Sequence, residues 1–362
     1  MNNIIETDRD IWQYLAESNK KIVMYGMGNG ADKILNICKE KGIEISDFFA
    51  SDGFVRGHSF HGKTVLTYSE IKEKHSDFIV LLSFATALPD VLSKIDEIGK
   101  EAELLVPDVP VFGSTLFDMD FCKKHLGEIM ECYELFSDER SKEVYKATIN
   151  AKLTGKTEFL NASVDTKSSV YNDILDCESY RSYADLGAYN GDTIRELSEY
   201  AKHLENVYAL EPDKRTFKKL YNYASAEERF KVHCHNTAAW NKNEILFFDG
   251  SGNRNSNISS STETLSGKKP LEISAQSLDS ILSGDVVDYI KYDVEGSEKE
   301  ALEGSYETIK KFHPDLLVSL YHRSEDVFTL PKMIKELGYN KLYLRRFRYY
   351  PAWDLNLYAR YN

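Results

Sequence analysis

The feature that most constrains this chain is an arrangement that occurs twice: an apolar run, a glycine turn and a helical stretch. The first copy leads from Lys21–Tyr25 into glycines at 26, 28 and 30, and the second leads from Ser182–Leu186 into the segment DLGAYNGDT. Strands that alternate with helices form parallel sheets, because parallel neighbours need a long crossover. The chain has 362 residues, more than one ordinary core of about 250–300 residues holds. We therefore predict an α/β protein with two Rossmann-like domains.

We divide the chain into three parts by these patterns. Residues 1–110 alternate short apolar runs with helical stretches and are predicted to form a smaller N-terminal α/β domain. Its segment SDGFVRGHSFHGKTV resembles the accessory Rossmann-like domains of sugar-modifying proteins, which implies a Rossmann-like accessory domain. Residues 111–172 repeat apolar positions at three and four spacing, which predicts a helical connector. Within it, Ser137 or Asp138 resembles an N-cap and Gly155 a helix stop. Residues 173–362 are predicted to form the second domain.

The second domain contains seven predicted strands. A short Tyr-Tyr-Pro-Ala-Trp turn joins the last two, so they should be antiparallel, and the other connections allow six parallel strands. A Ser-, Asn- and Gly-rich segment at 250–270 indicates an exposed loop, or alternatively a lid over a site. The predicted strands are Ser182–Leu186, Asn206–Leu210, Phe230–Cys234, Val287–Tyr292, Leu316–Leu320, Lys341–Phe347 and Asp354–Tyr361.

Charge and composition exclude several classes of protein. The formal charge of -13 argues against a broad surface for nucleic acid or anionic membrane. No run of 18 apolar residues occurs, and the acidic start is unlike a signal peptide, so we expect a cytoplasmic protein without a membrane partner. The five cysteines are scattered without a CxxC pair, which predicts neither a disulfide framework nor a zinc site.

The segment DLGAYNGDT points to a nucleoside ligand without phosphates. Tyr189 stands where a dinucleotide fingerprint has its second glycine, so a pyrophosphate would be crowded. Asp185 at the strand end can accept a hydrogen bond from an ammonium group, and the turn amides can bind a carboxylate. Glu211, at the end of the next predicted strand, can accept hydrogen bonds from both ribose hydroxyls. Small residues at Thr237 and Ala238, after the third strand, leave room for a flat base.

These motifs, taken in order, resemble the class I S-adenosylmethionine-dependent methyltransferases and, more narrowly, the FkbM family. The resemblance covers roughly residues 182–361 and depends on the sequence of DLGAYNGDT, ALEPD, NTAAW and YIKYDVEGSE, followed by Tyr321-His322. It implies a seven-stranded sheet with a terminal antiparallel hairpin, and S-adenosyl-L-methionine as cofactor. The implied cofactor residues are Asp185, Gly187, Ala188, Tyr189, Asn190, Gly191, Asp192, Thr193, Glu211, Pro212, Thr237, Ala238 and Asp293.

The same resemblance implies O-methylation of a hydroxyl on a sugar, glycan or natural-product acceptor. The candidate catalytic residues are His322, Asp293 and Glu295, and His322 ranks first because its ordinary pKa lies near neutrality. Glu295 has an alternative role as a cap of the helix expected from Ser297. Lys291 is expected to be structural. No metal site is predicted, although a divalent metal bound by Asp293 and Glu295 stays an alternative.

Two further regions carry competing interpretations. The last predicted turn gathers three aromatic residues and three arginines, which can bind a sugar-like acceptor or can simply pack the hairpin: Tyr349, Tyr350, Trp353, Arg345, Arg346 and Arg348. In the first domain, Gly26, Gly28 and Ala31 have dinucleotide spacing. The alternative functions are therefore an NAD-dependent sugar oxidoreductase and a non-catalytic nucleotide or S-adenosylmethionine sensor. A homodimer is an open alternative to a monomer.

Overall fold

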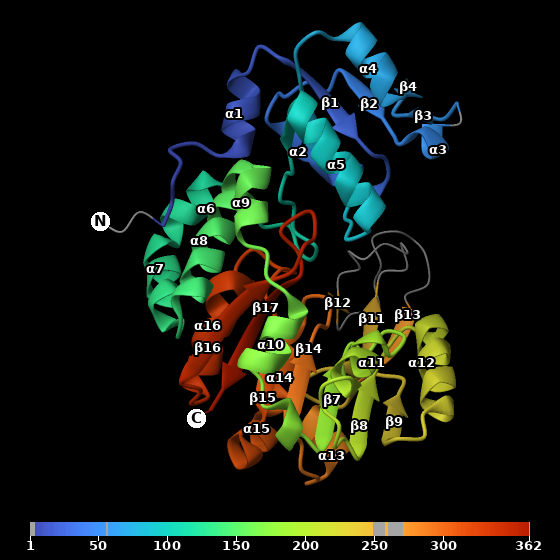
Figure 1. Cartoon of the computed structure of the whole chain (residues 1–362), viewed down its shortest axis with the longest axis vertical. Coiled ribbons are helices and arrows are strands. Elements are labelled where there is room, and N and C mark those ends of the chain that lie inside the picture. Colours follow the sequence, from blue (N-terminus) through green and yellow to red (C-terminus); the bar gives the residue numbers. More distant parts are fainter. Residues whose placement is uncertain (1–3, 56, 249–257, 260–270, 362) are drawn as a thin grey trace.

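Two sheets, each flanked by helices, are joined by a group of connector helices (Figure 1). The computed structural model describes residues 4–55, 57–248, 258–259 and 271–361. The boundaries that we place at residues 110 and 172 stay predictions. None of the helices in the described part of the chain combines the length and apolarity needed to cross a bilayer.

The first sheet has six strands in the order β3-β4-β2-β1-β5-β6. All neighbours are parallel except the short β3, which is antiparallel to β4. Its glycine turn uses positive φ at Gly26 and Gly28, and the following Ala31 is buried. The elements are α1 (Ile11–Glu17), β1 (Lys21–Tyr25), α2 (Asn29–Glu40), β2 (Asp47–Phe49), α3 (Asp52–Val55), β3 (Ser59–Phe60), β4 (Lys63–Leu66), α4 (Tyr68–Lys74), β5 (Phe78–Leu82), α5 (Pro89–Glu101) and β6 (Glu103–Leu105).

The connector is helical, as predicted. Asp138 is the N-cap of α8, and its side chain accepts a hydrogen bond from the Ser141 amide, while Gly155 ends the helix at φ 67°. The buried ion pair between Lys152 of α8 and Asp108, at 2.7 Å, ties this helix to the chain that leaves β6. The helices are α6 (Met119–Lys124), α7 (Leu126–Leu135), α8 (Glu139–Thr154), α9 (Thr157–Ala162), α10 (Lys167–Asp173) and the 3₁₀ helix η1 (Cys177–Ser179).

The large sheet of the second domain has seven strands in the order β16-β17-β15-β14-β7-β8-β9. Only β17 is antiparallel to its neighbours, which confirms the predicted terminal hairpin. The first two strands begin and end where the sequence predicts, and the others differ by one or two residues. The strands are β7 (Ser182–Leu186), β8 (Asn206–Leu210), β9 (Lys231–His235), β14 (Tyr289–Tyr292), β15 (Asp315–Ser319), β16 (Lys341–Arg346) and β17 (Leu355–Arg360).

Helices cover both faces of this sheet. Alternate residues of β7 point to opposite cores: Tyr183 packs with apolar residues of α10, α11 and α12, whereas Ala184 and Leu186 pack with residues of the other helices and of α7 and α8. This alternation is the period of two expected for a strand buried on both sides. The helices are α11 (Asp192–Ser198), α12 (Lys214–Ala226), α13 (Leu278–Leu282), α14 (Glu298–Glu303), α15 (Tyr306–Phe312) and α16 (Asp326–Glu336).

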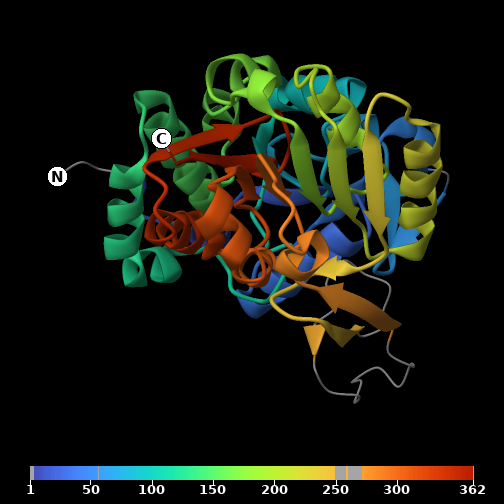
Figure 2. The ribbon, with the colours of Figure 1, turned by 90° about the horizontal axis from the view of Figure 1, so that it is seen from below.

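The second domain also contains a smaller sheet of four strands, which the sequence analysis missed. It has the order β10-β13-β11-β12 and stands off one side of the domain (Figure 2). Its strands are β10 (Ala238–Ala239), β11 (Glu244–Phe248), β12 (Ile258–Ser259) and β13 (Leu271–Gln276). Apart from β12, the segment at 250–270, interpreted as a loop or a lid, lies outside the described residues.

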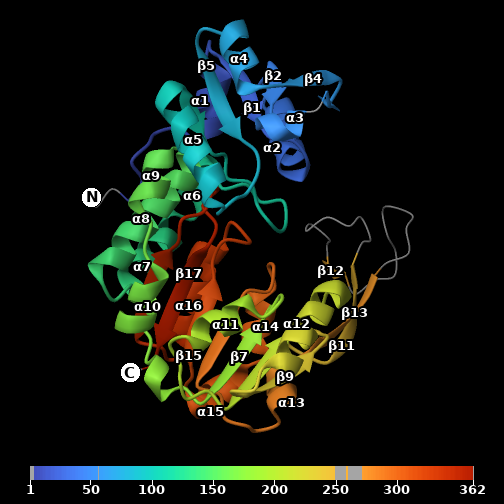
Figure 3. The same cartoon turned by 45° about the vertical axis from the view of Figure 1, so that its right-hand side comes forward.

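The turn of the terminal hairpin docks on the first domain and the connector (Figure 3). Tyr350 exchanges two backbone hydrogen bonds with Thr86, and its side chain is 1% exposed. Arg348 pairs with Asp96 of α5. These contacts favour the packing interpretation of the turn over the acceptor-binding one.

The other two arginines of the hairpin also bind other parts of the chain. Arg346 is fully buried and donates to Ser163 and to the backbone carbonyls of Leu160 and Tyr349. Arg345 pairs with Asp138, the N-cap of α8, at 2.6 Å. Of the two alternatives for these arginines, packing applies to Arg345 and Arg346, because their guanidinium groups are enclosed by the connector.

Candidate active site

The carboxyl ends of β7, β14 and β15 bring the predicted motifs together at one edge of the large sheet. Leu186, Tyr292 and Val318 are direct neighbours across these strands, so the residues that follow them lie side by side. The turn after β7 touches the residue after β14: a Cβ added at Gly187, whose φ is 85°, would lie 1.9 Å from the carbonyl oxygen of Asp293. Glycine is required here by both backbone conformation and space.

Asp185 lies beneath this turn and is completely buried. Thr193 donates to its Oδ2 at 2.5 Å, and the ammonium group of Lys291 donates to its Oδ1 at 3.1 Å. Burial raises the pKa of Asp185, and Lys291 and Thr193 oppose that rise. Because both oxygens already have donors, Asp185 anchors the turn and the start of α11 to β14. Its expected contact with an ammonium group of the cofactor stays a prediction.

Lys291 takes a larger part in the site than the sequence indicated. Its side chain points away from the core that holds Tyr292, as expected, and is 7% exposed. It also donates to the carbonyl of Gly187 and lies 3.7 Å from Asp293 Oδ2. Burial disfavours its charge, but Asp185 and Asp293 reverse that effect and raise its pKa above the ordinary value. Lys291 thus links the turn after β7 to Asp293, one of the candidate catalytic residues.

The remaining turn residues divide between structure and solvent. The amides of Gly187 and Ala188 both donate to the Leu210 carbonyl, so they are occupied within the sheet. Gly191 packs on Tyr223 of α12, whose ring would lie 2.4 Å from an added Cβ, so a larger side chain has no room here. Tyr189 has φ 46° and is 51% exposed. Its neighbours Asn190, Asp192 and Thr193 complete the turn into α11.

Glu211 follows β8 at the same edge and is 8% exposed. Its Oε1 accepts a hydrogen bond from the Asp213 amide at 2.8 Å. Burial is the main reason that its pKa is raised to about 7. Asn236 fixes the turn by donating to the carbonyls of Glu211 and Pro212. A buried carboxylate at the second strand tip can accept the hydrogen bonds that the two free hydroxyls of a ribose donate.

The residues that follow the third strand, β9, begin the four-stranded sheet, which the sequence analysis did not expect. Thr237 is buried, and its hydroxyl donates to the Ser274 carbonyl of β13 at 2.9 Å. Ala238 pairs with Ala275 in the same sheet. The two residues expected to form an adenine wall are therefore held by β13, a strand that the sequence analysis did not recognise.

Asp293 lies near both Lys291 and His322. Its Oδ1 accepts a hydrogen bond from the Tyr321 hydroxyl at 2.9 Å, and its side chain is 32% exposed. Burial would raise the pKa of Asp293, but the attraction of Lys291 and His322 outweighs burial and lowers it. Asp293 is consequently ionised at neutral pH.

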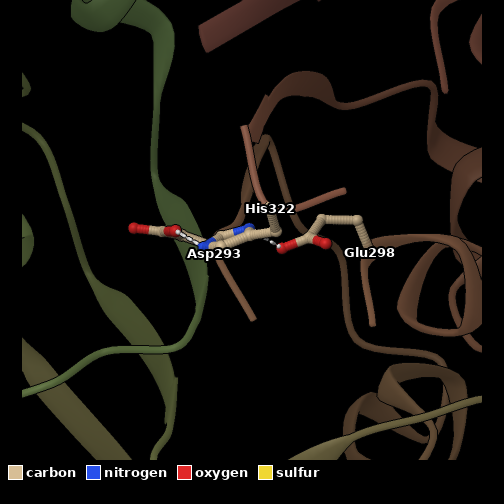
Figure 4. Close-up of side chains that lie close together, drawn as sticks. All are labelled: Asp293, Glu298 and His322. Carbon is tan, nitrogen blue, oxygen red and sulfur yellow. Dashed lines mark ion pairs between the residues drawn. The ribbon is translucent and has the colours of Figure 1, made fainter. Parts of the chain in front are cut away.

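His322 lies in a row between two carboxylates (Figure 4). Its Nδ1 is 2.8 Å from Glu298 Oε1, an ion pair whose angle falls short of a hydrogen bond. Its Nε2 faces Asp293 at 3.6 Å and Glu295 at 3.8 Å. Burial would lower the pKa of His322, but these carboxylates, Glu298 foremost, raise it to about 9. The imidazole therefore holds its proton near pH 7, contrary to our expectation of a free base.

Glu298 is the main residue of this row that sequence reasoning missed. It is 1% exposed, and its Oε1 also accepts from the Val294 amide at 2.9 Å. The sequence analysis considered Glu295 as the cap at this helix start, whereas the carboxylate that binds the amide belongs to Glu298. An acidic residue in the first turn of a helix was visible in the sequence, but that position is common on surface helices. Nothing local marked it as buried.

The strap of residues 106–118, between β6 and α6, lies against this site. The Phe112 amide donates to the His322 carbonyl at 2.9 Å, and a Cβ added at Gly296 would lie 2.8 Å from the Phe112 side chain. Lys33 of the first domain donates to the Pro110 carbonyl of the same strap. The first domain is thereby connected to the backbone that carries His322.

One cavity lies beside these residues, and a larger one lies elsewhere in the described part of the chain. One of about 80 Å³ is lined by Lys291, Asp293 and Asp354 together with aromatic residues of the same sheet face. It is too small for a typical ligand, which needs about 300 Å³ or more. Another, of about 690 Å³, is lined by residues 5–11 and by Tyr14 and contains no motif residue. We therefore locate the candidate site at the strand ends and not in the larger cavity.

Comparisons with known proteins agree with this geometry. Residues 185–341 match the family described as methyltransferase FkbM domain, a range that begins at Asp185 and includes Glu211, Asp293 and His322. The second domain therefore contains an FkbM methyltransferase domain. Residues 18–104 match a separate family, described as C2185-like, N-terminal. No curated protein matches this chain.

A solved structure has a similar fold over nearly the whole chain. The crystal structure of methyltransferase FkbM from Methylobacillus flagellatus KT covers 99% of this chain and 95% of that one, with a TM-score of 0.71 and 19% sequence identity. At this identity the likeness shows the fold. Fibrillarin from Aeropyrum pernix, solved with S-adenosyl-L-methionine, covers 51% of this chain and 68% of that one, with a TM-score of 0.33 and 12% identity.

Proposed function

We propose that this protein transfers a methyl group from S-adenosyl-L-methionine to a hydroxyl of a sugar, a glycan or another small-molecule acceptor. The observation that carries the proposal is the row Asp293, His322 and Glu298 at the tips of β14 and β15, directly beside the turn after β7. Methylation of a hydroxyl requires a group that accepts its proton, and the carboxylates of this row support such a role.

The cofactor roles follow the strand tips of the FkbM domain. Glu211 would accept hydrogen bonds from the ribose hydroxyls, and Thr237 and Ala238 would lie against the adenine. The turn at Gly187–Thr193 would hold the methionine end. Glu211 supports this assignment, because it is a nearly buried carboxylate at the required strand end and offers acceptors for the two hydroxyls. S-adenosyl-L-methionine, when bound, supplies an electrophilic methyl group.

We assign the acceptance of the hydroxyl proton to Asp293 or Glu295 in place of His322. Both nitrogens of His322 face carboxylates, so this imidazole is better suited to orienting them than to taking a further proton. The side chains of Asp293 and Glu295 are 32% and 60% exposed, so both can reach an acceptor. His322 is consequently proposed as a positioning residue.

Calorimetry with the full chain tests the cofactor. Saturable binding of S-adenosylhomocysteine, weakened by Glu211→Gln, is the expected result. Binding of NAD without either sulfur nucleoside would favour the oxidoreductase alternative at Gly26, Gly28 and Ala31. Binding of a nucleoside without turnover of any acceptor would favour the sensor.

Release of S-adenosylhomocysteine in the presence of nucleotide sugars, glycans and polyketide alcohols tests the acceptor class. Asp293→Asn and Glu295→Gln should separate the two proton acceptors: the true one loses turnover while cofactor affinity is retained. A sugar or glycan acceptor, no nucleic-acid or membrane partner, a homodimer and a cytoplasmic location are all still predictions.

A further inference from the structure

We propose that His322 Nε2, Asp293 and Glu295 together form a binding site for a divalent transition-metal ion, with Glu298 orienting the imidazole from its other side. The three residues come from two strand ends, and His322 Nε2 faces one carboxylate oxygen of Asp293 and one of Glu295. One imidazole nitrogen and carboxylate oxygens are ligands suited to ions such as Mn²⁺ and Zn²⁺.

The first argument is an imidazole nitrogen without a partner. His322 is 1% exposed, and its Nε2 has no hydrogen-bond partner among the described residues, although two carboxylates face it. A buried polar atom without a partner is unfavourable. A proton shared with the carboxylates or a metal ion can occupy this position, and the separations distinguish the two.

The separations suit a metal ion better than a direct hydrogen bond. Nε2 lies 3.6 Å from Asp293 Oδ1 and 3.8 Å from Glu295 Oε2, both longer than a hydrogen bond. Metal-ligand bonds of about 2.1 Å place two ligand atoms about 3.4 Å apart at a tetrahedral angle and about 3.6 Å apart at 120°. The observed spacing therefore leaves a gap of the size that an ion needs.

The second argument is the carboxylate behind the ring. Histidine ligands usually donate their other ring N–H to a carboxylate, which fixes the tautomer and the ring orientation. Glu298 Oε1, 2.8 Å from Nδ1, is placed for this, and Glu298 lies on the side of the ring opposite Asp293 (Figure 4). Glu298 is thus a supporting residue rather than a third ligand on the same ion.

Local charge also favours a cation. Asp293, Glu295 and Glu298 are all ion-paired with the single imidazole, whereas Lys291 forms its shorter ion pair with Asp185. If the proposed function holds, an ion here would bind the acceptor oxygen and ease loss of its proton. The ion-binding site itself depends only on these side chains.

Direct binding of Mn²⁺ and Zn²⁺ to the chelator-treated full chain is the test, by electron paramagnetic resonance of free Mn²⁺ and by calorimetry. We expect one ion per chain, and affinity at least tenfold lower in Glu295→Gln and His322→Gln. Glu298→Gln should weaken binding tenfold to a hundredfold, the range for residues that support a ligand. Glu303→Gln, which removes an exposed carboxylate from the same helix, is the matched control and should bind as the wild type does.

The outcomes separate this proposal from the proposed function. No saturable binding of either ion, or equal binding by wild type and Glu295→Gln, would overturn the metal site and assign the position to a proton. Glu295 is exposed, so its variant is expected to fold, and circular dichroism checks this for each protein. Failure to bind S-adenosylhomocysteine would instead contradict the methyltransferase proposal without affecting the ion measurement.

Discussion

Glu211 is the residue whose protonation we expect to control cofactor binding. Its carboxyl is 8% exposed at the end of β8, and burial raises its pKa to about 7. In the proposed role the ionised form would accept hydrogen bonds from both ribose hydroxyls, so binding below pH 7 would first have to remove a proton. Affinity should therefore rise with pH and level off above 7. One pH unit below the pKa, this costs about 1.4 kcal/mol, or about tenfold in Kd.

Calorimetry with S-adenosylhomocysteine at pH 6 and pH 8 measures this effect. Glu211→Gln stays neutral throughout, so its affinity should lose the tenfold difference and be lower at pH 8 by about 1.5–3 kcal/mol, the usual contribution of a hydrogen bond to a charged group. Glu205→Gln, an exposed residue before the start of β8, should keep the wild-type profile. If Glu211→Gln retains both the affinity and the slope, the ribose assignment is wrong.

Two further predictions concern stability. Gly187→Ala should lower Tm strongly, because its Cβ would clash with the Asp293 carbonyl, whereas Gly284→Ala, at φ 100° with nothing within 4 Å, isolates the backbone strain alone; similar melting temperatures would contradict the close approach. Lys291→Met leaves the Asp185 carboxylate buried without its cation and should reduce the free energy of unfolding in urea by about 3–5 kcal/mol. A loss below about 1 kcal/mol would show that Asp185 does not depend on this pair.

Local signals in the sequence were sufficient for most of the large sheet. β7 and β8 were predicted to the residue because apolar runs there end in turn residues, and the short final turn required an antiparallel hairpin. The strands β11 and β13 were missed because they flank the polar, glycine-rich segment that was interpreted as a loop or lid. The pairing of β11 with β13, and of β13 with Ala238, is a property of the assembled chain.

The roles of charged residues were harder to predict than the strands. Arg346 looked available to an acceptor because sequence shows only its type, whereas its burial comes from α9, more than 180 residues earlier. Likewise, the shift in the pKa of His322 originates in Glu298, 24 positions before it. Such shifts depend on burial and distance, which the residue order does not contain.

The sequence by itself determined the α/β class, the order of the cofactor motifs and the strand ends that carry them, because turns and strand periodicity are local properties. Only the tertiary structure decided that Lys291 joins Asp185 to Asp293, that Glu298 lies behind His322, and that the hairpin arginines hold the connector. These are contacts between elements distant in the chain. Their strength comes from exclusion of water, which exists only once these elements have packed together.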